Sequence, residues 1–495
     1  MLTLLVTMLL SAGTSCAPDP PVAPRLVVLF AACTVNRDYL SPYNPDVEFT
    51  PALSRVAREG VTFGHHWSEA GQSGIAFASI FSGTQSPGHG VHAHPTWIDD
   101  SVHLVTEAFA SAGYEPFFWG GHQIASDKYN YAQGTPPPNI YREALRSDDS
   151  KFTAVLDRLA RDPSYRALIV TNFTITHAPY GTRHVREFCA RYPRDCGIAA
   201  AQPQRLRRYA VLQIQNHREL ANNFPETIER LGLGGEIEQF AEALELLYRS
   251  NIHHLDGIFG ALVDAIDAAG LREESLVAFT ADHGETLYRD NALFKWTHGW
   301  ELAPEVLRVP WIMRGDASLA SRGRYLATSR SIDVFPTLAG LAGLDLTAGE
   351  ANPSMGVNLA PALRGDRDAP DLTAWSHTVV QHPSALDRIR NATLWLRYHK
   401  GVNRGEMWVA RARGDDYYKY RNLDGEHWGF QRFDLASDPE ERSDLYDPDR
   451  PEDRAAAKEL TTYRAALMAA WRASAQPDEL DEDELRALQE LGYID

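Results

Sequence analysis

Short apolar runs alternate with amphipathic segments along most of this 495-residue chain. The apolar runs are typical of buried strands, because a strand covered on both faces is continuously apolar. Helical patterns fill the intervals between these runs. This order predicts an α/β fold in which helices cover a mainly parallel sheet. The four predicted strands are Leu26–Phe30, Glu115–Trp119, Ala167–Phe173 and Leu276–Thr280.

Two of the predicted helices have clear ends. Thr50 followed by Pro51 is typical of a helix cap and first turn, and Gly60 is expected to end that helix. A much longer helix is predicted over residues 236–269, where apolar residues recur at spacings of three, four, seven and eight. Gly270 supplies its stop signal.

The pattern changes after about residue 365. Residues 373–433 are rich in Trp, Tyr, Thr and Val and are interrupted by Asn, Gly and Asp, which predicts a small antiparallel sheet, and a helix is predicted over residues 451–473. We therefore expect an α/β domain over residues 25–365, a C-terminal subdomain over residues 366–475 and a tail over residues 476–495. The expected strands of the small sheet include Ala392–Tyr398, Glu406–Arg411 and Gly429–Leu435.

The net charge of the chain limits the kinds of partner that it is expected to bind. Lys and Arg number 48 against 66 Asp and Glu, which gives a net charge of −18. Such a chain repels polyanions, so nucleic acid and anionic membrane surfaces are not expected as main partners. An anionic small molecule remains compatible with the acidic surface, because a local cluster of His and Lys can reverse the sign inside a pocket.

The first 24 residues contain no Lys or Arg, and Leu2–Ala12 is a short apolar run. The run is too short to span a bilayer and resembles the core of an export signal. Small residues before Cys16 and a Pro-rich stretch after it resemble a bacterial lipoprotein signal. We therefore expect export to the periplasm or cell envelope, either with membrane attachment through a lipidated Cys16 or without it. In an exported protein, Cys189 and Cys196 would pair as a disulfide.

The clearest chemical signal lies at the carboxyl end of the last predicted strand. The strand runs directly into Asp282, His283, Gly284 and Glu285. This edge is where open α/β sheets place ligand groups. Asp282 offers a hard carboxylate oxygen and His283 an imidazole, and both are donors for a divalent metal. The alternative is a strand-to-loop turn with a surface Asp and His.

The segment resembles the Asp-His/Asn-Gly-Glu signature of sulfatases and related phospho- and sulfo-ester hydrolases of the alkaline phosphatase superfamily. The resemblance runs from about residue 25 to residue 450 and includes seven further segments in the family order. It implies an alkaline-phosphatase-like α/β/α sandwich with a large mixed, mainly parallel sheet. The further segments are Thr50–Phe63, Ile80–Val91, Thr176–Tyr180, Asp256–Gly270, Lys295 with His298 through Pro310, Asp333–Leu338 and Phe433–Glu440.

In that family an ester binds beside a divalent ion, expected to be calcium. A nucleophile at a helix start attacks sulfur or phosphorus while the metal, His and Lys neutralise the developing charge. The resemblance implies that His177, Lys295 and His298 bind the anion and contact the leaving group. It also implies that Asp282 and His283 bind the metal. The implied substrate is a sulfate or phosphate ester, either a small molecule or a glycan.

Ser73 falls at the nucleophile position, counted back from Ile80–Gly83. Sulfatases carry there a Cys or Ser that matures to formylglycine, and maturation requires Pro or Ala two residues later and Arg four residues later. Ile75 and Phe77 occupy those positions, so formylglycine is not expected. An unmodified Ser73 resembles the nucleophile of the phosphatase branch and needs a metal or a base to become reactive. The alternative is a small serine at a helix start.

The other departures concern the metal and the anion. The first strand should lead into metal-binding carboxylates but leads instead to Cys33. Calcium and magnesium prefer several hard oxygens, whereas a thiolate with His and Asp favours zinc. The alternative is that Cys33 is a small buried residue in an inactive site. The family's Lys-x-His is also changed, and His122 is expected to take its substrate-binding role. The further histidines near Ser73 are candidates to hold a metal in a different way, but most of them are expected at the surface; they are His65, His66, His89, His92 and His94.

Three hypotheses follow. The first is a metal-dependent hydrolase of sulfate or phosphate esters with Ser73 as nucleophile and an altered metal site. The second is a catalytically impaired pseudoenzyme that keeps the fold and binds an anionic ligand or a partner. The third is an ordinary sulfatase whose alignment near Cys33 and Ser73 is shifted by a few residues. Anion chemistry is favoured by five retained residues, which are Asp282, His283, His177, Lys295 and His298. The loss of the first carboxylates and of the maturation pattern favours the second hypothesis.

Overall fold

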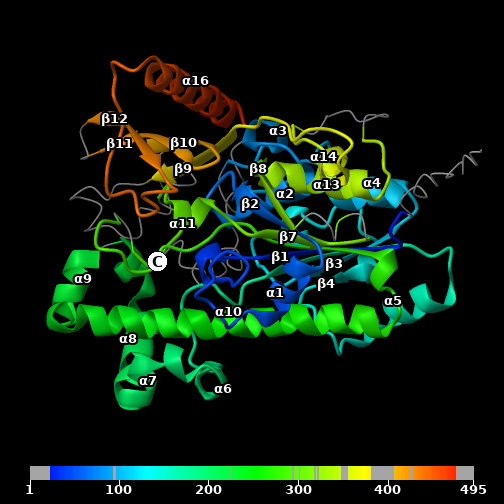
Figure 1. The fold of residues 1–495 in the computed structure, drawn as a ribbon, viewed down its shortest axis with the longest axis horizontal. Helices are drawn as coiled ribbons and strands as arrows, with labels where there is room; N and C mark the ends of the chain where they lie inside the picture. The colour runs from blue at the N-terminus through cyan, green and yellow to red at the C-terminus, as the bar shows by residue number, and fades with distance from the viewer. Residues whose placement is uncertain are drawn as a thin grey trace, which may run out of the picture.

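A mixed eight-stranded sheet forms the centre of the computed structural model (Figure 1). Its strand order is β4-β3-β5-β1-β6-β7-β2-β8; β7 is antiparallel to β6 and β2, and the other neighbours are parallel. The expected mainly parallel α/β fold is confirmed. The strands are β1 (Leu26–Ala32), β2 (Val61–Trp67), β3 (Glu115–Gly120), β4 (Ile140–Tyr141), β5 (Ala167–Phe173), β6 (Ser275–Ala281), β7 (Trp311–Arg314) and β8 (Gly323–Arg330).

The structure describes residues 23–92, 96–222, 224–292, 295–299, 301–316, 319, 323–346, 355–380, 406–423 and 427–474.

The central strand β1 is buried along its whole length, and its side chains alternate between two cores. Val28 and Phe30 face the core under the long helix α10 (Ile237–Ala268), and Val27 and Leu29 face the opposite core. Figure 1 shows helices on both faces of the sheet, which is the expected α/β/α sandwich. The α10 face also carries α1 (Pro51–Arg58) and α5 (Ser150–Arg161), and the opposite face carries α2 (Ser73–Ser82), α4 (Val105–Ser111), α13 (Val334–Leu341) and α14 (Ala360–Arg364).

A four-stranded antiparallel sheet, of order β12-β11-β10-β9, follows the main sheet in the chain. Its strands are β9 (Ala374–Val380), β10 (Glu406–Arg413), β11 (Asp416–Asn422) and β12 (Trp428–Asp434), and α16 (Pro451–Ala473) packs on it through Leu460 and Leu467. The small sheet and its helix agree with the expectation, although Ala392–Tyr398 lies outside the described residues. The remaining helices are α3 (Ser86–His89), α6 (Val185–Arg191), α7 (Gly197–Ala201), α8 (Pro203–Asn222), α9 (Phe224–Arg230) and α11 (Pro304–Leu307).

Helix α1 begins at Pro51 as predicted, but its cap comes from elsewhere in the chain. The Thr50 side chain makes no capping hydrogen bond to the helix. The carboxylate of Asp256, on α10, instead accepts hydrogen bonds from the backbone N–H groups of Ala52 (3.0 Å) and Leu53 (2.8 Å). A buried carboxylate from a distant helix therefore replaces the local cap, a contact that a sequence pattern does not reveal.

Several expectations about the chain ends remain predictions. The leader up to residue 22, including Cys16, and the tail from residue 476 lie outside the described residues, and the proposed domain limits stay predictions.

Cys189 and Cys196 form the expected disulfide. No helix in the described part of the chain combines the length and apolar character needed to cross a bilayer.

Candidate active site

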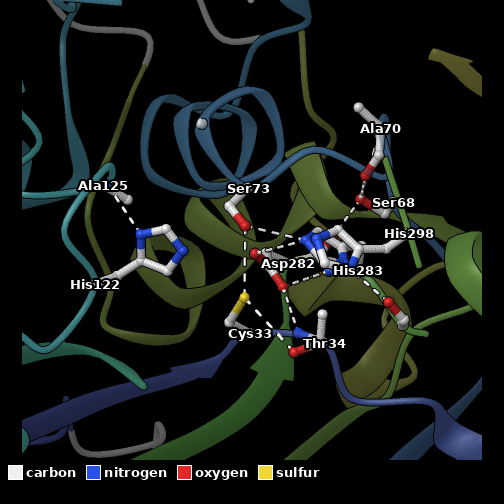
Figure 2. Close-up of polar contacts among 12 residues, drawn as sticks. Cys33, Thr34, Ser68, Ala70, Ser73, His122, Ala125, Asp282, His283 and His298 are labelled. Atoms are coloured by element: carbon white, nitrogen blue, oxygen red, sulfur yellow. Dashed lines mark hydrogen bonds and ion pairs between the residues drawn. The ribbon is translucent and has the colours of Figure 1, made fainter. Parts of the chain in front are cut away.

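The candidate site lies at the carboxyl edge of the three central parallel strands. The register places Ala32 of β1 beside Phe173 of β5 and Ala281 of β6, so the residues that follow these strands emerge together. Cys33 follows β1 and Asp282 follows β6, which brings residues about 250 positions apart into one cluster (Figure 2). Parallel pairing alone therefore assembles most of the site.

Ser73 is the first residue of α2 and is fully buried. Its Oγ lies 3.0 Å from Nε2 of His283. The other ring nitrogen of His283, Nδ1, lies 2.9 Å from the carbonyl oxygen of Gly284. A carbonyl only accepts, so Nδ1 carries the hydrogen and Nε2 presents a lone pair to the Ser73 hydroxyl. The imidazole is thus oriented as a base for Ser73.

The Asp282 carboxylate is fully buried beside this pair. Its Oδ1 accepts hydrogen bonds from the backbone N–H groups of Thr34 (3.1 Å) and His283 (2.6 Å). Its Oδ2 accepts no hydrogen bond within the described residues and lies 3.3 Å from Nε2 of His283. Burial raises the pKa of Asp282. Two acceptor atoms this close repel each other, and a proton on the Asp282 carboxyl, which its raised pKa favours, removes that repulsion while the His283 ring stays neutral.

Three potential metal donors converge at the same place. One ligand atom each from Cys33, His122 and Asp282 lie within 4.8 Å of one another, and all three residues are buried. Burial raises the pKa of the Cys33 thiol well above its ordinary value, and the Asp282 charge raises it further. The family resemblance implies calcium here, but one carboxylate does not supply the several hard oxygens that calcium needs. The donor set therefore does not fit that ion.

The orientation of His122 also counts against direct metal binding. Its Nδ1 accepts hydrogen bonds from the backbone N–H groups of Ile124 and Ala125, both at 3.2 Å. That nitrogen must carry the lone pair, so Nε2 carries the hydrogen. Figure 2 shows this second nitrogen on the side that faces Ser73, Cys33 and Asp282. His122 therefore presents an N–H donor, which suits an ester oxygen better than a metal ion.

Two further histidines and Glu285 extend the cluster. His283 and His298 stack with ring centroids 4.3 Å apart, and the His177 ring lies 4.8 Å from that of His298. The Glu285 carboxylate accepts a 3.2 Å hydrogen bond from Nδ1 of His298 and a 2.9 Å hydrogen bond from the hydroxyl of Tyr180. Burial raises the pKa of Glu285 to about 7. These contacts connect the expected anion-binding histidines to the Ser73–His283 pair.

Burial leaves the two expected anion-binding histidines uncharged. It lowers the pKa of His177 to about 3 and the pKa of His298 well below its ordinary value. Nδ1 of His177 donates to the carbonyl oxygen of Ala178, and its Nε2 has no hydrogen-bond partner within the described residues. A bound anion would favour their protonation, because an opposite charge nearby stabilises the cation.

Lys295 was predicted to belong to the site, but its contacts are with residues outside the Ser73–His283 cluster. Its Nζ donates a 2.6 Å hydrogen bond to the carbonyl oxygen of Ala292. The same ammonium lies 5.3 Å from the ring centre of Phe224 and 5.8 Å from that of Tyr288. Burial lowers its pKa. The structure therefore joins Ser73, His283, His298 and His177 through successive contacts and places His122 near Cys33 and Asp282. It places the lysine against a carbonyl and two aromatic rings.

Sequence reasoning missed two features of the site. Glu285 and Tyr180 stood inside recognised segments, but no periodicity showed that they would bond to each other across the fold. The expectation that the histidines near Ser73 lie at the surface is wrong for His66, His89 and His92, which are all buried. Each lies beside buried polar partners or aromatic rings, which a local pattern does not show; His94 lies outside the described residues.

Comparisons with known proteins identify the family of the chain. Residues 25–344 match the family model described as Sulfatase. The chain is 30% identical over 227 residues to the choline-sulfatase of Rhizobium meliloti (strain 1021). This alignment covers 45% of this chain and 37% of that enzyme. The chain thus spans less than two fifths of the length of that enzyme and of the other first curated relatives that it matches.

Solved structures with a similar fold cover almost the whole chain. One is a protein in complex with its substrate D-glucosamine-2-N,6-O-disulfate, with a TM-score of 0.61 and 15% identity over 92% of this chain and 100% of that chain. Another is the phosphonate monoester hydrolase of Agrobacterium radiobacter, with a TM-score of 0.57 and 16% identity over 93% and 98% of the two chains. At this identity the likeness shows the fold alone. The family match over residues 25–344, which is most of the chain, shows that it belongs to the sulfatase family of alkaline-phosphatase-like proteins.

Proposed function

We propose that this chain hydrolyses sulfate or phosphate esters with an unmodified Ser73 as nucleophile. The observation that carries the proposal is the 3.0 Å contact between Ser73 Oγ and His283 Nε2, in which Gly284 fixes the imidazole in the accepting tautomer. A hydroxyl needs such a base to become nucleophilic near neutral pH. Formylglycine is not required in this scheme, in agreement with Ile75 and Phe77 at the maturation positions.

In the first step Ser73 Oγ attacks sulfur or phosphorus, its proton passes to His283, and the bond to the alcohol oxygen breaks. The attacking and leaving oxygens are in line, so the leaving oxygen cannot take its proton from His283. His298 stacks on the His283 ring and His177 packs against His298, and we propose that one of these two histidines, protonated beside the bound anion, supplies that proton. Water then attacks sulfur or phosphorus of the ester formed on Ser73 and gives its proton to the histidine that protonated the alcohol. The bond to Ser73 Oγ breaks, Ser73 takes its proton back from His283, and sulfate or phosphate is released.

The expected metal dependence has less support than the serine chemistry. The Cys33, His122 and Asp282 group has one carboxylate, a thiol with a raised pKa and an imidazole that presents N–H. We therefore assign no catalytic step to a calcium ion. His122 Nε2–H and the protonated His177 or His298 are the proposed partners of the ester oxygens.

The proposed substrate class is a sulfated or phosphorylated small molecule or glycan. The sulfated glucosamine bound to a structural relative and the choline-sulfatase among the sequence relatives support sulfate esters, and the phosphonate monoester hydrolase supports phosphorus esters. Export to the periplasm or cell envelope, with or without a lipid on Cys16, remains part of the proposal.

The test is turnover of 4-nitrophenyl sulfate and 4-nitrophenyl phosphate by the full chain. Ser73→Ala should lower turnover on the order of 10³-fold or more, and His283→Gln should do the same. Ser82→Ala is the matched control, because Ser82 is a buried serine of the same helix whose hydroxyl donates to Ala78. Equal turnover by Ser73→Ala and the control would contradict the proposal.

A second candidate is the impaired pseudoenzyme. The placement of Lys295 against Ala292 and the single carboxylate near Cys33 favour it, because both remove charge that stabilises the reaction. This candidate predicts no turnover of either ester. Inorganic sulfate or D-glucosamine-2-N,6-O-disulfate should nevertheless raise its melting temperature, since a ligand that binds only the folded state stabilises it.

A further inference from the structure

The segment that leads to Ser73 is held by the edge strand of the small C-terminal sheet. The backbone N–H of His377, on β9, donates to the carbonyl oxygen of Glu69 at 2.8 Å. The Ser376 hydroxyl donates to the carbonyl oxygen of Ser68 at 2.6 Å. An isolated parallel bridge also joins Ala70 and His377. Residues some 300 positions apart thus form one backbone connection four residues before the candidate nucleophile.

The Glu69 side chain extends this connection to two helices. Its carboxylate is buried, with 3% of the residue exposed. Oε1 accepts a 2.8 Å hydrogen bond from the backbone N–H of Ser86, the first residue of α3. Oε2 accepts a hydrogen bond from the hydroxyl of Ser79, in the middle of α2. The Glu69 carboxylate therefore joins the nucleophile helix to the next helix, while the Glu69 backbone carbonyl is bonded to β9.

Two buried histidines lie on either side of this carboxylate. Nε2 of His89 lies 3.7 Å from Oε2 of Glu69, and Nδ1 of His377 lies 3.8 Å from Oε1. Nδ1 of His89 accepts the backbone N–H of Val91 at 3.1 Å, so its Nε2–H donates to Ser79 Oγ at 3.2 Å. Burial alone would raise the pKa of Glu69, but the two imidazoles outweigh burial and lower it.

We propose that Glu69 and His377 are positioning residues that set the place of Ser73 by joining α2 and α3 to β9. They touch neither the Ser73 hydroxyl nor His283 in any contact described above, so they act through the backbone and through Ser79. A small error in the placement of a nucleophile lowers the rate far more than it lowers substrate binding. The expected effect on turnover rests on the proposed function, whereas the effect on the order of the site does not.

The experiment compares Glu69→Gln with Glu107→Gln in the full chain. Glu107 is the matched control, because its carboxylate also accepts a backbone N–H and a side-chain donor, from Leu104 and Gln133, but lies on α4. Two readouts are used: kcat and KM for 4-nitrophenyl sulfate and phosphate, and the rate at which iodoacetamide alkylates Cys33, followed by peptide mass spectrometry. Cys33 reports on the site because its Sγ lies 3.5 Å from Ser73 Oγ.

Glu69→Gln should lower kcat by about 100-fold with little change in KM, and it should speed Cys33 alkylation several-fold. Glu107→Gln should change neither readout, even if it lowers the melting temperature as much. His377→Gln should act like Glu69→Gln and replaces it if that variant does not fold. Cys33 alkylation at the wild-type rate in both Glu69→Gln and His377→Gln overturns the inference, and so does an equal increase in Glu107→Gln. If the wild type turns over neither ester, the proposed function fails, and the alkylation rates alone decide the positioning role.

Discussion

Sγ of Cys33 lies 3.5 Å from Oγ of Ser73, and both residues are fully buried. A thiol thus stands beside the candidate nucleophile at the position where the family resemblance expects a metal-binding carboxylate. Asp282, on the neighbouring strand end, keeps one carboxylate oxygen without a hydrogen bond within the described residues. The site therefore keeps one carboxylate for a hard cation, and a second carboxylate at position 33 would add another hard donor beside it.

Cys33→Asp should create calcium binding that the wild type lacks. Without the ion, the new buried carboxylate beside Asp282 should destabilise the protein, since two like charges in a buried place repel. Calcium should reverse that loss and raise the melting temperature by an amount that grows with its concentration. Thermal unfolding in chelator and in calcium measures both effects.

Cys33→Asn is the control for the calcium experiment, because it has the same size as the aspartate without its charge. It should show no calcium-dependent shift. A calcium-dependent shift of the wild type as large as that of Cys33→Asp would show that the native donor set already fits calcium.

Tyr180→Phe should destabilise the fold, because it removes the hydroxyl that donates to Oε2 of Glu285 at 2.9 Å. Both residues are fully buried, and a buried carboxylate oxygen that loses its donor costs about 1–3 kcal/mol. Urea unfolding measures the loss. Tyr209→Phe is the matched control, because Tyr209 donates to Glu236, whose side chain is 31% exposed and can bond to water instead. A control loss as large as that of Tyr180→Phe would contradict the role of burial.

Four strands of the main sheet, β1, β3, β5 and β6, could be predicted from the sequence because they are short, mainly apolar runs. The predicted Ala167–Phe173 coincides with β5, and the predicted 236–269 helix differs from α10 by one residue at each end. β7 was not predicted, because it has only four residues, Trp311–Arg314, and its antiparallel pairing with β6 depends on contacts far apart in the chain. Local periodicity carries no information about such pairing.

The site could be predicted only as far as the strand ends define it. Cys33 and Asp282 meet because two parallel strands end together, and parallel strands are what the apolar pattern predicts. Lys295 lies on a loop, so its partner Ala292 follows from loop geometry and from the rings packed around it. The tautomer of His283 likewise depends on a carbonyl oxygen that any residue could supply.

Removal of the Cys189–Cys196 disulfide should lower stability modestly. The two cysteines are seven positions apart, so the bond closes a short loop and restricts the unfolded chain less than a long one would. The expected loss is about 2 kcal/mol. Chemical unfolding of Cys189→Ser/Cys196→Ser measures it, and a reductant should lower the stability of the wild type but not that of the double variant. If the reductant lowered the stability of both proteins equally, its effect would not come from the Cys189–Cys196 disulfide.

His66 should make the fold less stable as the solution becomes acidic. The ring is fully buried, its Nδ1 lies 3.0 Å from the Ser329 hydroxyl, and the Trp311 ring packs 4.7 Å away. Burial, aided by the positive charge of Arg37, lowers the pKa of His66 to about 3 from an ordinary value of 6.5. Between these two values the unfolded chain binds a proton that the folded chain excludes.

The sign of the effect follows from that difference. The His66 contribution is fully present above pH 6.5 and is lost progressively as the pH falls towards 3. One excluded proton corresponds to a slope of about 1.4 kcal/mol per pH unit in the free energy of unfolding. Urea unfolding between about pH 4 and 6 should therefore give a shallower slope for His66→Gln than for the wild type, by about that amount. The substitution also lowers stability at neutral pH through lost packing, so the comparison depends on the slopes and not on the absolute values; equal slopes would mean that the folded state admits the proton.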